Sequence, residues 1–313
     1  MPSLTKFSVI IPFHNAHETI RETVISVIAQ KVDRFEIIIV DDRSSPTSIE
    51  TLDDLSRNDD RIKVIKSMRP GPSAARNAAV DISTGDIICF LDADDCFRSG
   101  ALRFYEKAFR RIPGLGVAFG RVRITPSPAH SGGIITPLCA SPTLTQIIGE
   151  NRVCTTSNIV VRREAFTEIG GFNENLSHAE DQEWLARAYL NARWVLRGMD
   201  RVTLDYRTSP NGLSSDLRKM ERGWLKMLAT FKAREPSVSD SQIAAVRGAF
   251  YRYLARRALR LGASRIDGAS YFGRAVKSYP TIVFTEVQRT WSTAIAALAV
   301  LFFGTRLFRR VLH

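Results

Sequence analysis

Short apolar runs alternate with amphipathic stretches through the first third of the chain. Runs rich in Ile and Val are typical of strands buried on both faces, and they occupy residues 7–11, 35–40, 62–65 and 87–91. Helical spacing of apolar residues predicts a helix over 17–30, and a stretch of small residues predicts another over 73–80. Strands that alternate with helices indicate an α/β fold with a mostly parallel sheet flanked by helices.

The remaining pattern divides the chain into two regions. We expect helices at 99–111, 163–169 and 181–190, a strand at 159–161 and a loop rich in Ser, Pro and Gly at 126–142. Residues 216–278 read as helical and rich in Arg. The pattern therefore predicts an α/β domain over 1–215 and a basic helical region over 216–313.

Charge is distributed unevenly between these regions. The 313 residues include 44 Lys and Arg and 32 Asp and Glu, a net charge of +12. Residues 1–186 contain 21 basic and 24 acidic residues, whereas 187–313 contain 23 and 8. A basic C-terminal region suits an anionic membrane surface at least as well as a nucleic acid. Since no nucleic-acid-binding motif accompanies it, we expect no nucleic-acid partner.

An uncharged segment near the C-terminal end bears on localisation. Residues 290–305 would form a helix about 24 Å long, shorter than the roughly 30 Å of a bilayer core. Three interpretations remain open: a membrane-embedded anchor, a buried or dimer-forming helix, and a disordered tail. The four cysteines show neither a CxxC pair nor metal-ligand spacing, which favours a reducing compartment. We expect a cytoplasmic protein that is peripheral to, or anchored at, the inner membrane.

Carboxylates follow two of the predicted strands. Asp41 and Asp42 end the second strand, and Asp92, Asp94 and Asp95 end the fourth. A turn or cap would explain either group alone. Ligands of parallel sheets bind at the carboxyl ends of strands, however, and carboxylates that converge there repel one another unless a cation or donor hydrogens lie between them. The pattern therefore predicts a ligand site.

With these residues in view, the chain resembles a family 2 inverting glycosyltransferase with the GT-A fold. The matching stretches, in the family's order, are residues 8–30, 35–45, 71–95, 157–174 and 178–188. They lie within the first 210 residues, and the C-terminal hundred are outside the resemblance. The match rests on the order and spacing of all five stretches, because an Asp-x-Asp motif alone would be a weak signal.

The resemblance implies a nucleotide-diphosphate sugar donor, with uridine as the expected nucleoside, and a divalent cation. Asp94 would bind Mg²⁺ or Mn²⁺, and Asp92 would hold the ribose or a metal-bound water; Asp95 is a further candidate. The residues expected to bind the donor are Pro12, His14, Asn15, Asp42, Arg76, Asp92 and Arg207.

Several of these donor-binding roles have alternatives. Asp42 would accept from the uracil imide in a pocket shaped by the turn Pro12–Asn15, while Asp41 serves as a backbone cap. Arg76 would face the nucleotide, or simply pair with a carboxylate on a helix surface. Arg207 would meet the diphosphate, or belong to an ordinary loop.

A Glu-Asp pair at the start of a predicted helix completes the resemblance. Asp181 would act as the base that takes the proton of the acceptor hydroxyl, and Glu180 would position the acceptor or raise the pKa of Asp181. Capping of the helix is the alternative role. We expect transfer of a single sugar to a glycan or lipid-linked acceptor in cell-surface polysaccharide synthesis. A non-catalytic scaffold that binds nucleotide sugars is the alternative function.

Overall fold

The computed structural model describes residues 5–127, 132–208, 216–262 and 264–304. It contains two compact units, one comprising residues 1–142 with 153–210 and the other 143–152 with 211–313. The boundary predicted at residue 215 lies outside the described residues. Residues 143–152 belong to the second unit although they precede much of the first in sequence, a connection that the apolar pattern did not indicate.

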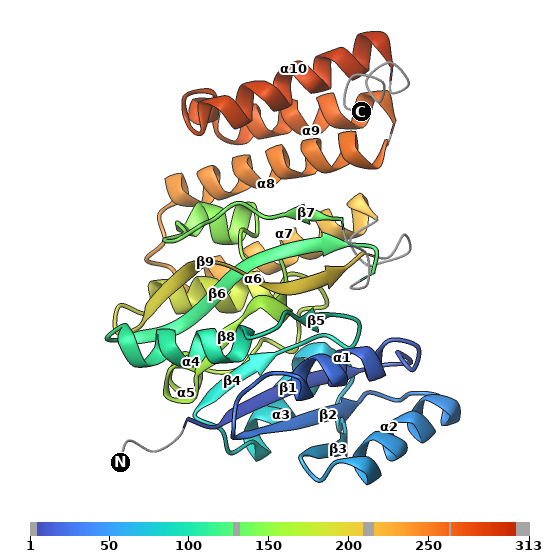
Figure 1. The fold of residues 1–313 in the computed structure, drawn as a ribbon. Helices are drawn as coiled ribbons and strands as arrows, with labels where there is room; N and C mark the ends of the chain where they lie inside the picture. The colour runs from blue at the N-terminus through green and yellow to red at the C-terminus, as the bar shows by residue number, and fades with distance from the viewer. Residues whose placement is uncertain (1–4, 128–131, 209–215, 263, 305–313) are drawn as a thin grey trace. The chain divides into compact units, whose positions relative to one another are not determined.

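The first unit contains a sheet with the strand order β3-β2-β1-β4-β8-β6-β9-β5, and β7 pairs with β6 (Figure 1). The strands are β1 (Phe7–Phe13), β2 (Phe35–Asp41), β3 (Ile62–Lys66), β4 (Ile87–Phe90), β5 (Cys96–Phe97), β6 (Leu115–Thr125), β7 (Ile134–Ile135), β8 (Val160–Arg162) and β9 (Val195–Arg207). The four strands β3, β2, β1 and β4 are parallel. Their carboxyl ends consequently meet at one edge of the sheet, where the acidic residues follow.

Helices and helical turns surround this sheet. They are α1 (Ile20–Ile28), α2 (Pro46–Asn58), α3 (Pro72–Ile82), α4 (Ala101–Arg111), η2 (Thr156–Asn158), α5 (Arg163–Ile169) and α6 (Glu180–Leu190). The first predicted helix begins three residues later than expected, because Asn15 adopts a left-handed φ of 52° and Thr19 takes the N-cap position. The apolar pattern did not predict α2, β6 or β9.

Most of the apolar runs became strands that are covered on both faces, whereas β3 keeps exposed and half-buried positions. All seven residues of β2 are buried, as are six of the seven in β1. Pro12 lies within β1, so the expectation that it belongs to a turn was wrong. The pairing of β1 with β4 ends at Ile10 and Phe90, and the missing N–H of Pro12 therefore removes no bond to that strand.

The second unit is helical. Its elements are η1 (Thr145–Gly149), α7 (Leu217–Arg234), α8 (Asp240–Leu261), α9 (Arg265–Ser278), η4 (Pro280–Phe284) and α10 (Val287–Phe303). Trp224 stacks on Phe250 at 3.7 Å between ring centroids and donates to the Ile148 carbonyl at 2.8 Å. The fully buried Glu150 carboxylate accepts from Arg252 at 2.7 Å and forms an ion pair with Arg289 at 3.0 Å. These contacts fasten residues 143–152 to the helices.

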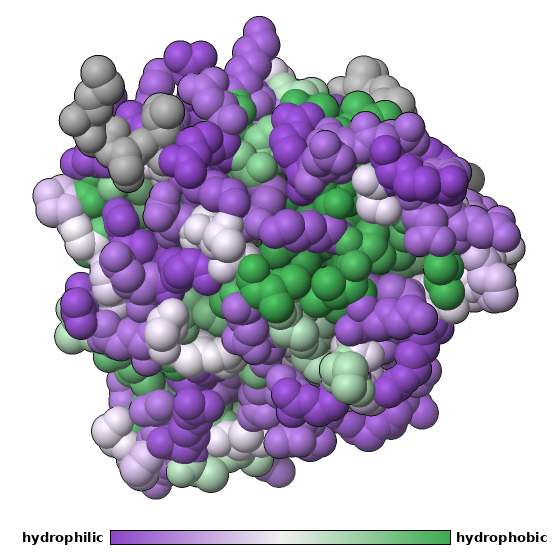
Figure 2. Space-filling view, turned by 90° about the horizontal axis from the view of Figure 1, so that it is seen from below, coloured by the Kyte–Doolittle hydropathy of each residue, from purple (hydrophilic) through white to green (hydrophobic). Residues whose placement is uncertain are grey.

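Apolar side chains are not confined to the interior. Figure 2 shows hydrophobic residues gathered in one area of the face it presents, within surroundings that are mostly hydrophilic. Among the described residues, no helix combines the length and the apolar character needed to cross a bilayer. Single exposed apolar side chains are ordinary on a protein surface, whereas a contiguous group of them can mark a contact surface.

Candidate active site

The start of α3 connects the two acidic strand ends. Gly71, the N-cap residue of α3, donates its N–H to Asp42 Oδ2 at 2.7 Å. One and a half turns along the same helix, Arg76 donates from Nη2 to Asp92 Oδ1 at 2.7 Å. The carboxylates that follow β2 and β4 are therefore held against one helix, as the topology of parallel strands predicts.

Arg76 also reaches the start of α6. Its Nη1 donates to Glu180 Oε1 at 3.0 Å, and its side chain is only 4% exposed. Burial alone would lower the pKa of Arg76, but the charges of Asp92 and Glu180 outweigh burial and raise it. One buried guanidinium thus joins the end of β4 to the Glu-Asp pair, although the two are 88 positions apart in sequence. Of the two roles considered for Arg76, the structure contains the carboxylate pairing.

The loop of residues 92–95 concentrates negative charge. Burial raises the pKa of Asp94, and the charge of Asp92 raises it further. The pKa of Asp95 lies well above its ordinary value because the side chain is buried and both other carboxylates are near. Asp95 Oδ2 is buried and has no hydrogen-bond partner among the described residues. This arrangement favours binding of a cation or of hydrogen-bond donors.

Neutral side chains fix the shape of the acidic loop. The carbonyl of Ala93 accepts from the hydroxyls of Thr19 at 2.9 Å and Thr23 at 3.0 Å, both near the start of α1. The N–H of Asp92 donates to Ser157 Oγ at 3.0 Å. Sequence reasoning missed these supporting residues, because a hydroxyl in a helix or a short turn carries no signal of the distant loop that it contacts.

Arg207, at the end of β9, also holds this loop. Its backbone N–H donates to Asp95 Oδ1 and its Nε to the Asp94 carbonyl, both at 2.9 Å. Its Nη2 pairs with Glu22 at 2.6 Å. The guanidinium is therefore engaged by the protein itself in this structure, and its contact with a diphosphate stays a prediction.

The residues expected around the base lie together beyond β1 and β2. His14 Nδ1 is 2.6 Å from the Asp42 carbonyl oxygen, and Asn15 Oδ1 accepts from the N–H of Ser45 at 2.8 Å. Asp42 Oδ1 is buried without a partner among the described residues, so it is available to a ligand donor. Asp41 Oδ1 accepts from the Ser44 N–H at 3.1 Å, which fits its expected role as a cap.

The Glu-Asp pair opens α6, which begins at Glu180 after Ala179 adopts a left-handed φ of 59°. Asp181 is 9% exposed, and its Oδ1 accepts from the N–H of Gln182 at 2.8 Å. Glu180 faces Arg76, as described above. The two carboxylates thus differ: one is paired with a guanidinium, and the other is held within the first turn of the helix.

The acidic loop fits a hard divalent cation in its donor chemistry. Asp92, Asp94 and Asp95 offer carboxylate oxygens, the ligands that Mg²⁺ and Mn²⁺ prefer. Within the part of the chain that the structure describes, no group of three His, Cys, Asp or Glu side chains could hold a metal ion. Mg²⁺ is usually bound through one or two carboxylates together with waters and substrate phosphates, and the loop is compatible with that mode.

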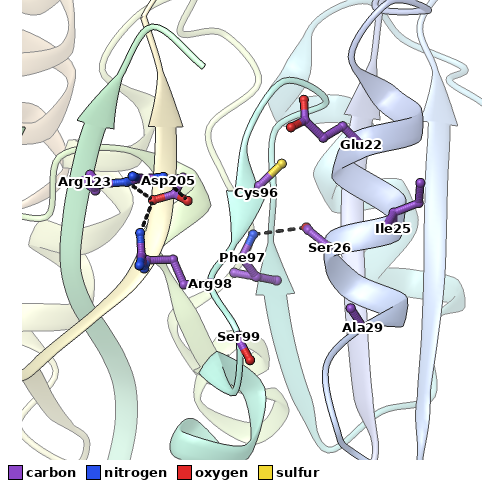
Figure 3. Close-up of a pocket in the computed structure, with 10 residues that line it drawn as sticks. All are labelled: Glu22, Ile25, Ser26, Ala29, Cys96, Phe97, Arg98, Ser99, Arg123 and Asp205. Carbon is purple, nitrogen blue, oxygen red and sulfur yellow. Dashed lines mark hydrogen bonds and ion pairs between the residues drawn. The ribbon is translucent and has the colours of Figure 1, made fainter. Parts of the chain in front are cut away.

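A cavity of about 440 Å³ lies between α1, β5 and β9 (Figure 3). Asp205 lines it and accepts from Arg98 at 3.1 Å and Arg123 at 2.7 Å. Glu22, which pairs with Arg207, lines the same cavity. The charged groups here already have protein partners. The lining also contains the free thiol of Cys96, whose pKa burial raises to about 12.

The order of the strands and the helices around them fit the GT-A fold, and comparison with known proteins identifies the family. The sequence pattern described as "Glycosyl transferase family 2" matches residues 8–170, which is more than half of the chain. The chain therefore belongs to glycosyl transferase family 2, as its resemblance predicted.

Two relatives illustrate the extent of the similarity. The amylovoran biosynthesis glycosyltransferase AmsB of Erwinia amylovora is 30% identical over 199 residues, which cover 58% of this chain and 63% of AmsB. The uncharacterized glycosyltransferase EpsJ of Bacillus subtilis is 28% identical over 215 residues, covering 66% of this chain and 62% of EpsJ. The chain thus matches less than two thirds of the length of either relative.

Solved structures share the fold. S. aureus TarS 1–349 in complex with UDP-GlcNAc has a TM-score of 0.54 at 21% identity, with 90% of this chain and 92% of that chain covered. The mannosyltransferase PcManGT from Pyrobaculum calidifontis, in complex with GDP-Man and Mn²⁺, has a TM-score of 0.53 at 15% identity, covering 96% and 88%. At these identities the likeness establishes the fold alone.

Proposed function

We propose that the protein is an inverting glycosyltransferase that moves a single sugar from a uridine-diphosphate donor to an acceptor hydroxyl. The observation that carries the proposal is the position of Arg76. Its guanidinium joins Asp92, in the loop after β4, to Glu180, the first residue of the Glu-Asp pair. Membership of family 2 supports the reaction class. AmsB, named for amylovoran biosynthesis, supports a role in polysaccharide assembly.

The donor would bind across the carboxyl ends of β1, β2 and β4. Asp42 Oδ1, buried and without a partner among the described residues, is the proposed acceptor for the uracil imide N–H. Pro12, His14 and Asn15 would shape the wall of the base pocket. Asp92, which pairs with Arg76, would hold the ribose or a metal-bound water, and Arg207 is the proposed contact of the diphosphate.

Asp94 would hold Mg²⁺ or Mn²⁺, with Asp92 and Asp95 beside it. When bound, the cation neutralises charge on the departing diphosphate. The role of the chain's own residues is to keep this loop in place: Thr19 and Thr23 fix the carbonyl of Ala93. The complex of PcManGT with Mn²⁺ is consistent with such a cation in this fold.

Asp181 would act as the catalytic base. The acceptor oxygen attacks the anomeric carbon from the face opposite the diphosphate, the bond from that carbon to the diphosphate oxygen breaks, and the hydroxyl proton passes to the Asp181 carboxylate. The products are an inverted glycoside and a nucleoside diphosphate. Glu180, held by Arg76, would orient the acceptor. A lipid-linked glycan at the cytoplasmic face of the inner membrane is the proposed acceptor.

A donor screen tests the proposal directly. Uridine and guanosine diphosphate sugars, each with and without Mn²⁺, are incubated with the protein and an extract of lipid-linked glycans, and released diphosphate is measured. We expect metal-dependent release from a uridine donor. Saturable donor binding in calorimetry without turnover on any extract would instead favour the non-catalytic scaffold.

The substitution Asp181→Asn separates the base from the donor site. We expect a loss of transfer of about 10³-fold, because an amide cannot accept the hydroxyl proton. Donor affinity should stay within about twofold, since Asp42 and Asp94 are unchanged. Full transfer activity in this variant would refute the assignment of Asp181 as base.

A further inference from the structure

Helix α10 has an apolar stripe that no described residue of its own unit covers. The stripe consists of Val287, Trp291, Ile295, Leu298 and Phe302, which are 53%, 51%, 65%, 52% and 72% exposed. At 3.6 residues per turn these side chains fall within an arc of about 80° and extend for about 22 Å. Phe284, just before the helix, is 78% exposed. Apolar groups so aligned and so exposed mark a contact surface.

A different face of α10 is packed within the second unit. Thr290, Thr293, Ala294, Ala297 and Val300 are buried there. Thr290 Oγ1 accepts from Arg252 Nη1 at 2.6 Å, and Thr293 Oγ1 from Arg256 Nη1 at 3.4 Å. Because these bonds tie α10 to α8, the helix cannot leave its unit to enter a bilayer lengthwise without breaking them. The stripe can therefore contact a surface that runs parallel to the axis of α10.

The charge of the second unit indicates what would cover the stripe. Its sequence contains 19 Lys and Arg against 7 Asp and Glu, whereas the first unit contains 25 of each. The whole net charge of +12 therefore belongs to the unit that contains α10. Burial lowers the pKa of Arg256, which contacts Thr293 of α10, and the nearby positive charge of Arg260 lowers it further.

We propose that the stripe of α10 lies on an anionic lipid bilayer, with the helix axis parallel to the membrane plane. An interfacial helix buries Trp, Phe and Leu at the boundary of head groups and acyl chains, while basic residues attract anionic lipid. A second copy of the chain fits less well, because pairing through α10 would bring two units of the same strong positive charge together. This inference deepens the membrane setting of the proposed function, on which it rests, and does not depend on the sugar-transfer chemistry.

Vesicle flotation of the full chain, without sugar donor, tests the inference. Vesicles contain phosphatidylcholine alone or with about one third phosphatidylglycerol. We expect the protein to float with the anionic vesicles and to be released as salt is raised. Binding should shift tryptophan emission to shorter wavelength. Trp291→Phe should remove most of the shift, since Trp184 and Trp224 are already buried and Trp194, in the first unit, is half-buried and donates to Glu168.

The double variant Ile295→Asp with Leu298→Asp should lower the partition into anionic vesicles by about tenfold or more, because it places two charges within the stripe. Its matched control is Ile25→Asp, an isoleucine of α1 that is 63% exposed, close to the 65% of Ile295. The control should float like the original protein. Circular dichroism of all variants verifies that they fold.

Three results would overturn the inference: no flotation of the original protein with anionic vesicles, equal flotation of the double variant, or a dimer in solution that the double variant separates. The last would make a second copy the occupant of the stripe. Turnover on a water-soluble acceptor should be retained in the double variant. If the original protein binds anionic vesicles but shows no turnover, the proposed function fails and this inference stands. If it shows turnover but binds no vesicles, this inference alone fails.

Discussion

Carboxylates at the two ends of the parallel strands have opposite environments, and their pKa values are shifted in opposite directions. At the amino end, Glu36 of β2 accepts from Ser8 Oγ at 2.8 Å, from the Thr84 N–H at 2.7 Å and from Lys63 Nζ at 3.1 Å. Although burial alone would raise it, these hydrogen bonds lower the pKa of Glu36 to about 2. At the carboxyl end, Asp94 and Asp95 crowd Asp92, and their pKa values are raised.

The difference separates a structural carboxylate from one that awaits a ligand. Glu36 has its donors within the protein, so it fastens three strands and has no capacity left for a substrate. Asp42 and Asp95 each keep a buried oxygen without a partner among the described residues. A buried polar group left in this state costs free energy, which a bound ligand would recover. We therefore expect substitutions at the two ends to affect different properties.

Asp94→Asn should give the largest effect. We expect turnover to fall by about 10³-fold or more, because the substitution removes the proposed cation ligand, while the free energy of unfolding does not decrease. Diphosphate release and denaturant unfolding measure the two. Asp86→Asn, at the amino end of the same strand, is the matched control and should retain turnover. An active Asp94→Asn protein would remove this residue from the proposed site.

Glu36→Gln should have the reverse effect. We expect it to lower the free energy of unfolding by about 2 kcal/mol, since several donors lose a charged acceptor, and to leave donor affinity unchanged. Urea unfolding and donor titration check this. Glu106→Gln, which breaks the helical pair with Arg110, provides a comparison, with an expected cost below about 0.5 kcal/mol. Equal losses of the free energy of unfolding in both variants would mean that the hydrogen bonds of Glu36 stabilise the fold no more than an exposed ion pair does.

The dependence of stability on pH sharpens the same comparison. The pKa of Glu36 is lowered on folding from 4.5 to about 2, so its contribution is fully present above pH 4.5 and is lost as the pH falls toward 2. The stability difference between the original protein and Glu36→Gln should shrink across that window. Unfolding curves at several pH values measure it, and a difference that stays constant down to pH 2 would contradict the assignment.

Asp95→Asn should change stability less than Glu36→Gln does, and in the opposite direction. Because burial and two neighbouring carboxylates raise its pKa, removing its charge should increase the free energy of unfolding of the metal-free protein by about 1 kcal/mol. Asn keeps Oδ1, which accepts from the Arg207 N–H. Thermal unfolding without metal is the measurement. A clear loss of stability would show that the charged carboxylate of Asp95 is stabilised by its surroundings, contrary to its raised pKa.

Two of the elements that sequence reasoning missed, α2 and β9, have many exposed or half-buried positions, whereas β6 was missed although most of it is buried. Of the 13 residues in α2, only Ser48 and Leu52 are buried, so no apolar pattern announces the helix. β9 alternates irregularly between exposed and buried positions, and β-bulges interrupt its pairing with β6. Such segments take their structure from neighbours contributed by distant parts of the chain, which a local pattern does not contain.

The sequence alone determined the parallel half of the sheet and the acidic residues at its edge, because a strand buried on both faces needs a continuous apolar run and a parallel topology brings carboxyl ends together. Only the tertiary structure decided that Arg76 joins Asp92 to Glu180 and that Arg207 holds the acidic loop. It also decided that one side of α10 is packed while another side is exposed among the described residues. Each of these arrangements depends on contacts between side chains that are far apart in sequence, and the spacing of residues along the chain does not specify such contacts.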